Sequence, residues 1–206
     1  MNKKEELEKL KREMEEDKDL PLRDVATQLV FGEGNSESKI YFIGEAPGFH
    51  EDRLGRPFVG QAGKLLDFLI ETIGFKREDV YISNVVRFRP PENRDPLPEE
   101  ILAFQPYVDR EIEIINPKLI VTLGRFSMGK FLPGVLISKV HGKPKVVMFH
   151  GKNVTVLPMY HPAAALRSTD VMRQLREDFE TIPKVLIKIE TEQEAGKKKT
   201  EQMGLL

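Results

Sequence analysis

The sequence contains no cysteine among its 206 residues. This absence excludes a disulfide framework, a thiol nucleophile, a thiolate zinc site and a cysteine-ligated iron–sulfur cluster. The sequence also lacks any apolar run near the roughly 18 residues that a membrane-spanning helix requires. Its N-terminus is charged where a secretory signal would be apolar. We therefore expect a cytoplasmic protein with no membrane partner.

Net charge is nearly absent, because the formal total is −1 although charged residues make up 32% of the chain. This total conceals a basic segment. Residues 134–176 hold seven lysines and arginines against one acid, Asp170, together with three of the four histidines. Such a local excess is typical of a surface that faces phosphates. It is equally typical of a solvated face that the acidic segment 92–113 balances in space.

Length and composition predict one folded domain with charged ends. Hydrophobic residues make up 40% of the chain, which is enough for a single packed core. Residues 1–19 are mostly charged, with apolar residues three and four apart, and this spacing predicts an amphipathic helical arm. Residues 190–206 are rich in glutamate, lysine and glutamine, so we expect a frayed or disordered tail there. Residues 20–189 then form the domain.

Within this domain, short apolar runs alternate with helical patterns. Strands are predicted at residues 39–44, 80–86, 119–123 and 154–157. Helices are predicted at residues 62–73, 99–115, 125–132 and about 171–189. Pro106 and Pro183 should bend their helices or delay the start. The alternation predicts an α/β fold with a mostly parallel sheet covered on both faces. Residues 146–147 and 154–157 are placed to add one antiparallel hairpin.

Polar residues stand where three of these strands end. In an open α/β sheet, ligands bind beyond the carboxyl ends of the strands. Glu45 follows the first predicted strand, Asn84 stands near the end of the second, and His161 follows the last. Each residue alone has an ordinary explanation, as a turn acid, a cap or a surface histidine. Together, at equivalent strand ends, they predict one shared crevice.

The loops around this crevice carry further candidates. Gly44 and Gly48 flank a proline, and glycines allow backbone amides to approach a ligand closely. Phe58 precedes a helix, where it is either an aromatic binding surface or a core side chain. The stiff, polar loop 89–98, with Asn93 at its tip, is typical of a functional loop rather than a packing element.

One segment imitates a nucleotide-binding motif. Residues 124–130 match the spacing GxxxxGK and follow a strand, as a phosphate-binding loop does. The next residue is Phe131, where a serine or threonine must hold magnesium. A phenylalanine there suits a helix that packs inward, so we do not expect an NTPase.

Four segments taken together carry a recognisable pattern. They are GEAPG at 44–48, GRPFVGQAGKLLD at 55–67, YISNVVRFRPPENRDP at 81–96 and YHPAAALRS at 160–168. In combination they resemble the family 4 uracil-DNA glycosylases, and the likeness extends from about residue 20 to residue 187. The resemblance implies a three-layer α/β/α sandwich around a central four-stranded, mostly parallel sheet. It also implies a monomer that removes uracil, the product of cytosine deamination, from single- or double-stranded DNA.

The chain departs from this family at the positions that usually hold a four-iron, four-sulfur cluster. The four aligned positions are Asp17, Leu20, Phe88 and Phe104. None of them ligates iron as a thiolate does, so we expect neither the cluster nor another metal or cofactor. Three are apolar, and an empty core volume costs about 24 cal/mol per Å³. We therefore hypothesise that a hydrophobic plug fills the volume of the cluster.

The resemblance assigns roles to the crevice residues. Phe58 stacks on the flipped uracil, and the amide of Asn84 reads its Watson–Crick edge and rejects cytosine. His161 donates a hydrogen bond to uracil O2, where negative charge develops as the base departs. The first loop contributes the backbone of Gly44, Ala46 and Gly48 to the same pocket.

The sequence leaves the activation of water open. Ala46 stands where related families have an aspartate, which removes the simplest general base. Glu45, Glu51 and Asn93 remain as candidates. Glu45 is nearest the motif, Glu51 lies one turn on, and Asn93 can only position water. We rank Glu45 and Asn93 first.

The segment that follows His161 lies inside the basic stretch, and the resemblance places it in the minor groove of DNA. Ala163 belongs to this segment, and Leu166 or Arg167 is the wedge that fills the gap left by the flipped base. Ser168 holds phosphate without reading sequence. Affinity for DNA should therefore fall steeply as salt is added.

Two other functions remain open at this stage. The chain could be a catalytically weak or inactive protein that binds damaged or single-stranded DNA on the same fold. It could also be a glycosylase of shifted specificity that acts on hypoxanthine or xanthine. Lyase activity is not expected, because no lysine is clearly placed to form a Schiff base.

Overall fold

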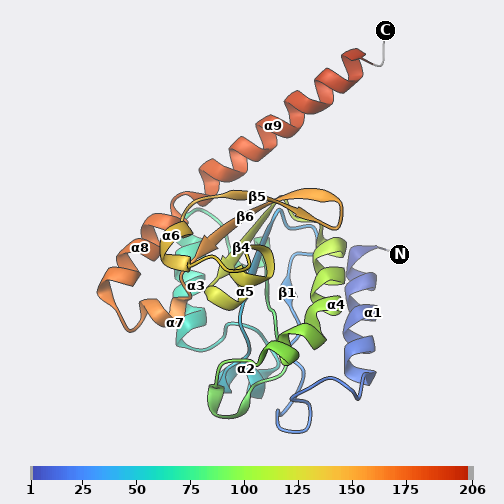
Figure 1. Cartoon of the computed structure of the whole chain (residues 1–206), viewed down its shortest axis with the longest axis vertical. Coiled ribbons are helices and arrows are strands. Elements are labelled where there is room, and N and C mark those ends of the chain that lie inside the picture. The colour runs from blue at the N-terminus through green and yellow to red at the C-terminus, as the bar shows by residue number, and fades with distance from the viewer. Residues whose placement is uncertain (1, 204–206) are drawn as a thin grey trace.

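The computed structural model describes residues 2–203 of the chain. Among these residues, the centre is a six-stranded sheet with the strand order β1-β3-β2-β4-β6-β5 (Figure 1). The four inner strands run parallel and are β3 (Tyr81–Asn84), β2 (Ile40–Gly44), β4 (Leu119–Leu123) and β6 (Lys152–Met159). The outer strands, β1 (Glu33–Gly34) and β5 (Lys145–Phe149), pair antiparallel with their neighbours. The sheet is therefore mixed.

The predicted four-stranded sheet is correct for the parallel core and wrong for the sheet as a whole. Strand β4 coincides with its predicted run, and β2 differs from its prediction by one residue. Strand β5 supplies the antiparallel pair expected from the hairpin. Strand β1 is only two residues long, one of them exposed, so it leaves no apolar run that a sequence pattern can reveal.

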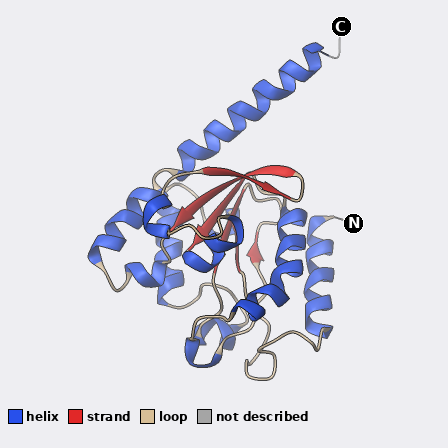
Figure 2. Cartoon of the chain, in the orientation of Figure 1, coloured by secondary structure: helices blue, strands red, loops and turns tan. Residues whose placement is uncertain are grey.

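Helices cover both faces of the sheet, which confirms the α/β/α architecture (Figure 2). One face carries α1 (Lys3–Glu16), α4 (Pro98–Ile115) and α5 (Arg125–Phe131). The other carries α3 (Gln61–Thr72), α8 (Thr169–Phe179) and the start of α9 (Ile182–Met203). Successive strand residues point to opposite faces. Tyr41 and Ile43 therefore join the first core cluster, whereas Ile40 and Phe42 join the second.

Short helical turns connect the larger elements. They are α2 (Phe49–Leu54), η1 (Arg77–Asp79), η2 (Pro91–Asn93), α6 (Ile137–Val140) and α7 (Pro162–Ala165). Three of them, α2, η2 and α7, follow the carboxyl ends of β2, β3 and β6. These turns therefore surround the edge of the sheet where the sequence predicts a crevice.

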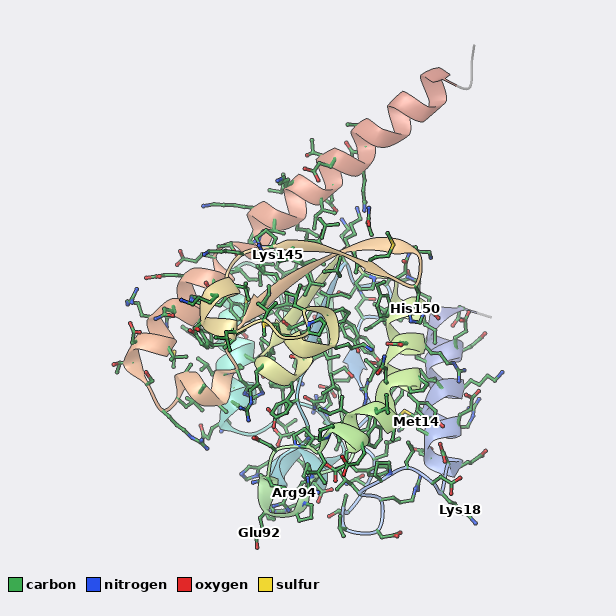
Figure 3. All side chains as sticks on the ribbon, viewed as in Figure 1. Met14, Lys18, Glu92, Arg94, Lys145 and His150 are labelled. Carbon is green, nitrogen blue, oxygen red and sulfur yellow. The ribbon has the colours of Figure 1, made fainter. Side chains whose placement is uncertain are left out.

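The N-terminal arm is a docked helix. Its apolar stripe of Leu7, Leu10 and Met14 is buried, and the side chain of Met14 points from α1 toward α4 (Figure 3). Asn2 begins the helix in a capping box with Glu5, where the side chain of each residue accepts a hydrogen bond from the backbone N–H of the other. The apolar residues spaced three and four apart in α1 are thus the ones that pack against α4.

The C-terminal end differs from its prediction. The expected helix over residues 171–189 is two helices, α8 and α9, and Pro183 occupies the first turn of α9, where proline is tolerated. The predicted frayed tail is helical up to Met203, and Figure 1 shows α9 leaving the body of the molecule. Its glutamates, lysines and glutamines are good helix formers, whereas the prediction of a frayed tail rested on their charge and polarity alone. Residues 204–206 lie outside the described residues.

Among residues 2–203, no helix is both long enough and apolar enough to cross a membrane.

Candidate active site

A cavity of about 400 Å³ opens beyond the carboxyl ends of β2, β3 and β6. The three polar residues predicted to meet, Glu45, Asn84 and His161, all line it. Its wall also includes the predicted residues Ala46, Gly48, Glu51, Phe58, Asn93, Ala163 and Arg167. The predicted crevice is therefore confirmed as one hollow. Gly44, Leu166 and Ser168 lie outside its lining.

Asn84 lines this hollow and has a buried polar atom without a partner among the described residues. It is the last residue of β3 and only 2% exposed, and its Oδ1 atom has no hydrogen-bond partner among the described residues. Buried polar atoms normally have partners, so this oxygen calls for a donor from a ligand. A Cβ on Gly44 would lie 2.5 Å from both Asn84 Oδ1 and Phe58 Cζ. Glycine at position 44 is therefore what lets the amide and the ring come together.

Phe58 is buried in an unusual backbone conformation. It is 4% exposed and has φ 51°, in the left-handed region that side chains other than glycine rarely adopt. Its ring stacks on the imidazole of His161, with 5.6 Å between the ring centroids and 28° between the planes. A Cβ on Gly63 of α3 would lie 1.9 Å from the carbonyl oxygen of Phe58. The loop is therefore pressed directly onto the helix.

Two charged side chains hold this loop, and we call Arg77 and Glu51 the Phe58 clamp. The guanidinium of Arg77, from η1, donates to the carbonyl oxygens of Pro57 at 2.6 Å and Phe58 at 3.1 Å. The carboxylate of Glu51, from α2, accepts from the two backbone amides that follow Phe58, both at 2.8 Å. The clamp thus fixes the backbone on both sides of the left-handed residue. The sequence analysis did not identify Arg77, which stands in a short polar turn with no periodicity to distinguish it.

His161 is placed to donate a proton from one defined ring nitrogen. It caps α7, and its Nδ1 atom accepts from the backbone amide of Ala163 at 3.1 Å. Burial lowers the pKa of the imidazole to about 4, and the nearby charge of Glu51 only partly opposes this effect. The ring is therefore neutral near pH 7, with its proton on Nε2. Gly124 has φ 95° and leaves room for the histidine, because a Cβ there would lie 3.1 Å from the Cβ of His161.

Glu45 is poised between its charged and neutral forms. Burial raises the pKa of its carboxyl to about 7, and the negative charge of Asp95 adds to this effect. The guanidinium of Arg125, which forms an exposed ion pair with Asp95, acts in the opposite direction. A carboxylate with a pKa near the working pH is suited to accept a proton from water.

The other two candidates for water activation are already engaged. Glu51 uses Oε1 to hold the backbone after Phe58. Asn93 lies in η2 with its Oδ1 atom accepting from Arg89 Nε at 2.7 Å. Figure 3 shows the neighbouring residues Glu92 and Arg94 at the outer edge of the molecule. Asn93 is therefore exposed at the rim of the hollow, whereas Glu45 lies in its wall.

The end of β3 that carries Asn84 rests on a buried ion pair. Arg87 donates to Glu111 of α4 at 2.6 Å, and the two side chains are at most 1% exposed. Arg87 also donates to Ser83, and the hydroxyl of Tyr81 donates to Glu111 at 3.2 Å. Removing one partner of a buried pair typically costs about 3–5 kcal/mol. This network, which the sequence analysis missed, fixes the strand end from the opposite side of the sheet.

The segment predicted to contact DNA surrounds α7 and the start of α8. Ala163 and Arg167 line the hollow, and the side chain of Leu166 is exposed beside it. The Ser168 hydroxyl caps α8 by accepting from the Val171 amide at 3.4 Å, which leaves its proton available to a phosphate. The geometry is compatible with the predicted roles of these residues in DNA binding.

The four positions that the resemblance assigns to cluster cysteines do not offer a set of ligands for an iron–sulfur cluster. Leu20, Phe88 and Phe104 are buried in the core between the sheet and α4, and the two phenylalanine rings lie 6.1 Å apart. None of these three offers a ligand atom. Asp17 ends α1 and accepts from the Tyr107 hydroxyl at 2.6 Å. The geometry therefore agrees with a packed hydrophobic plug.

Comparison with known proteins identifies the family. The sequence model of the uracil DNA glycosylase superfamily matches residues 31–182. The type-4 uracil-DNA glycosylase of Sulfurisphaera tokodaii is 48% identical over 189 residues, which are 88% of this chain and 85% of that protein. That of Saccharolobus solfataricus is 50% identical over 161 residues, 75% of this chain and 74% of that protein. That of Archaeoglobus fulgidus is 44% identical over 184 residues, 86% of this chain and 92% of that protein.

These matches span both the strand ends that form the hollow and the loops that line it. The resemblance inferred from the four sequence segments is therefore confirmed. The chain belongs to the uracil DNA glycosylase superfamily, among its type-4 enzymes.

Proposed function

We propose that this chain is a uracil-DNA glycosylase that flips uracil out of DNA and hydrolyses its N-glycosidic bond, leaving an abasic site. Family membership supports the reaction. The observation that carries the site is the unpaired, buried Oδ1 atom of Asn84, in one hollow with Phe58 and His161. An aromatic face, an amide and a neutral imidazole are the groups that a pocket for one flat, uncharged base requires.

Recognition follows from donor and acceptor positions. Phe58 supplies a stacking surface, while Asn84 Oδ1 accepts from uracil N3–H and its amide nitrogen donates to O4. Cytosine presents an acceptor at N3 and a donor at C4, so the same amide orientation leaves two unmatched contacts. Because buried unmatched polar groups are costly, the pocket selects uracil over cytosine.

His161 stabilises the departing base. As the bond between C1′ and N1 breaks, its electron pair moves onto uracil and negative charge develops at O2. The neutral imidazole donates Nε2–H to this oxygen, because Nδ1 is already occupied by the Ala163 amide. The depressed pKa keeps this arrangement across the physiological range.

Glu45 activates the attacking water in this proposal. Its carboxylate takes one proton from water while the water oxygen bonds to C1′ and uracil leaves as an anion. A pKa of about 7 leaves a substantial fraction of Glu45 ionised at neutral pH. Glu51 acts through Phe58 as a positioning residue, and Asn93 orients water or DNA from the rim.

The substrate is DNA approached through the basic segment. We place Leu166 or Arg167 as the wedge in the minor groove and Ser168 at a phosphate. One chain supplies the whole hollow, which supports action as a monomer on DNA. The packed positions of Leu20, Phe88 and Phe104 support a cofactor-free enzyme.

The test is the release of free uracil from oligonucleotides that carry one uracil, single-stranded or paired, followed by alkaline cleavage at abasic sites. We expect release from the wild type and loss of release from Asn84→Ala. Affinity should fall steeply between 50 and 200 mM salt. Tight retention of uracil-DNA without free base would identify an inactive damage-binding protein instead. Release of hypoxanthine or xanthine at comparable rates would indicate shifted specificity.

A further inference from the structure

A second hollow lies beside the uracil cavity and has no role in the chemistry above. It encloses about 500 Å³ between the start of α4 and α5. Its wall is mostly apolar, with Pro96, Pro98, Ile101 and Phe126 among its side chains. We call this hollow the flanking pocket.

The flanking pocket adjoins the proposed active site. Asp95 lines the uracil cavity, and the next residue, Pro96, lines the flanking pocket. In the same way, Asn84 lines the first hollow and Val85 the second. The exposed ion pair between Asp95 and Arg125 stands at the boundary. Residues that line the two hollows are therefore neighbours in the chain, and the contact between Asp95 and Arg125 joins the two walls.

The chemistry of the pocket fits an aromatic base that is linked to a phosphate group. The guanidinium of Arg125 lies over the ring of Phe126, with 4.6 Å from its central carbon to the ring centroid, so an aromatic and a cationic group stand together in the wall. Lys130 lies deeper in the wall and is neutralised by Asp109. Arg125 is 65% exposed, and an exposed ion pair contributes little stability, so its guanidinium is free to turn from Asp95 to a phosphate.

We propose that the flanking pocket binds the base of a nucleotide next to the uracil in the same, unpaired DNA strand. Stacked aromatic and arginine surfaces beside a cation are how proteins hold single-stranded bases without reading sequence. This inference rests on the proposed function of the neighbouring hollow. It adds a second base subsite, and it predicts that single-stranded uracil-DNA binds more tightly than the same sequence in a duplex.

Gly129 offers a way to fill the pocket without disturbing the fold. It lines the pocket from α5, and a Cβ at this position meets nothing within 4 Å. Gly129→Leu therefore places a side chain in the hollow. Gly129→Ala adds one methyl at the same helical position and serves as the matched control, because both replacements favour the helix over glycine.

The test compares single-stranded oligonucleotides in which the uracil nucleotide carries a 2′-fluorine, which slows cleavage so that binding is measured alone. In two of them, the nucleotide directly 5′ or 3′ to the uracil is replaced by a tetrahydrofuran, which lacks a base. Fluorescence anisotropy gives the dissociation constant of each oligonucleotide for the wild type, Gly129→Ala and Gly129→Leu. Uracil release is assayed in parallel on oligonucleotides without fluorine.

We expect the wild type to bind one of the two tetrahydrofuran oligonucleotides about tenfold more weakly, within the range found for one stacked base. Gly129→Leu should bind the intact strand about as weakly as the wild type binds that tetrahydrofuran strand. Removing the base should cause no further loss of affinity in this variant. Equal affinities of the wild type for all three strands would overturn the inference, as would wild-type affinity in Gly129→Leu. Absence of uracil release would instead contradict the proposed function, so the two hypotheses fail separately.

Discussion

The Phe58 clamp predicts that Arg77 controls the affinity for uracil although it does not line the uracil cavity. Arg77 is 21% exposed at its side chain and donates to the carbonyls of Pro57 and Phe58 while pairing with Glu33 and Asp67. Arg77→Met keeps an unbranched apolar stem in place of the arginine methylenes and removes the guanidinium, and with it every one of these contacts. The change therefore tests the clamp while retaining the apolar packing of the stem.

The expected loss of stability can be worked from these contacts. Hydrogen bonds to charged groups contribute about 1.5–3 kcal/mol each, and partial exposure lets water replace part of this at the two carbonyls. We therefore expect the free energy of unfolding to fall by about 2–3 kcal/mol in total. For a chain of this size, that corresponds to a fall in melting temperature of about 4–12 °C.

The expected loss of activity follows from the backbone of Phe58. A left-handed residue other than glycine costs about 1–2 kcal/mol, so the loop relaxes toward negative φ when the clamp is removed. The ring then leaves its place beside His161, and one stacked base is worth about 1–3 kcal/mol. We expect kcat/KM for uracil release to fall by about 10- to 100-fold, mostly through KM.

Arg56→Met is the matched control. Arg56 pairs with the same Glu33 at 2.7 Å, but it is 59% exposed and makes no hydrogen bond to the Phe58 loop. An exposed pair contributes at most about 1 kcal/mol, so this variant should melt and react nearly as the wild type does. Equal kcat/KM for Arg77→Met and Arg56→Met, measured below both melting temperatures, would refute the clamp.

Three further predictions concern the chemistry and the core. Replacing His161 by leucine, which has no hydrogen-bond donor, should slow single-turnover uracil release by about 10²–10³ at neutral pH, because one aligned donor to the developing oxyanion is lost. A smaller loss would assign that role elsewhere. Because the pKa of Glu45 is raised to about 7 and the base is its ionised form, the wild-type rate should increase with pH up to about 7 and then level off. Glu45→Gln should give a low rate without this rise, and an unchanged pH profile in the variant would exclude Glu45 as the base. Phe88→Ala should lower the free energy of unfolding by about 3–5 kcal/mol in thermal denaturation, since it empties the plug. Stoichiometric iron in the purified protein, or an unchanged melting temperature, would contradict the plug.

Much of the fold was predictable because its information is local. The strand over residues 119–123 is buried throughout and apolar at every residue but Thr122, so its ends follow from composition. The meeting of Glu45, Asn84 and His161 was predictable for a different reason. Parallel strands bring their carboxyl ends to one edge of the sheet, so residues at equivalent strand ends converge whatever their separation along the chain.

The supports of the site were not predictable in this way. Arg77 reaches Glu33 across 44 positions in the sequence and Phe58 across 19, and neither spacing leaves a periodic signal. The buried pair of Arg87 and Glu111 reads in the sequence as two ordinary charged residues. Contacts of this kind depend on how loops pack in three dimensions, which no single stretch of sequence encodes.

The residue that activates water was predictable only in part. Sequence alone left Glu45, Glu51 and Asn93 open, and Glu51 was ranked below the other two. In the structure, Glu51 holds the loop after Phe58 and Asn93 accepts a hydrogen bond from Arg89. Both side chains are therefore engaged in other contacts, which leaves Glu45 as the candidate general base. The catalytic assignment of Glu45 stays a prediction until the pH profile is measured.

The glycine at position 44 has a consequence for redesign. The main chain of Gly44 lies against both the amide of Asn84 and the ring of Phe58, so even a methyl group there would collide with both walls of the slot between them. Trimming side chains cannot deepen the slot at this point, because there is no side chain to trim. Mutant libraries aimed at bulkier lesions gain nothing by randomising this position. They must displace a strand or the aromatic wall, and each of these routes changes how the enzyme holds uracil itself.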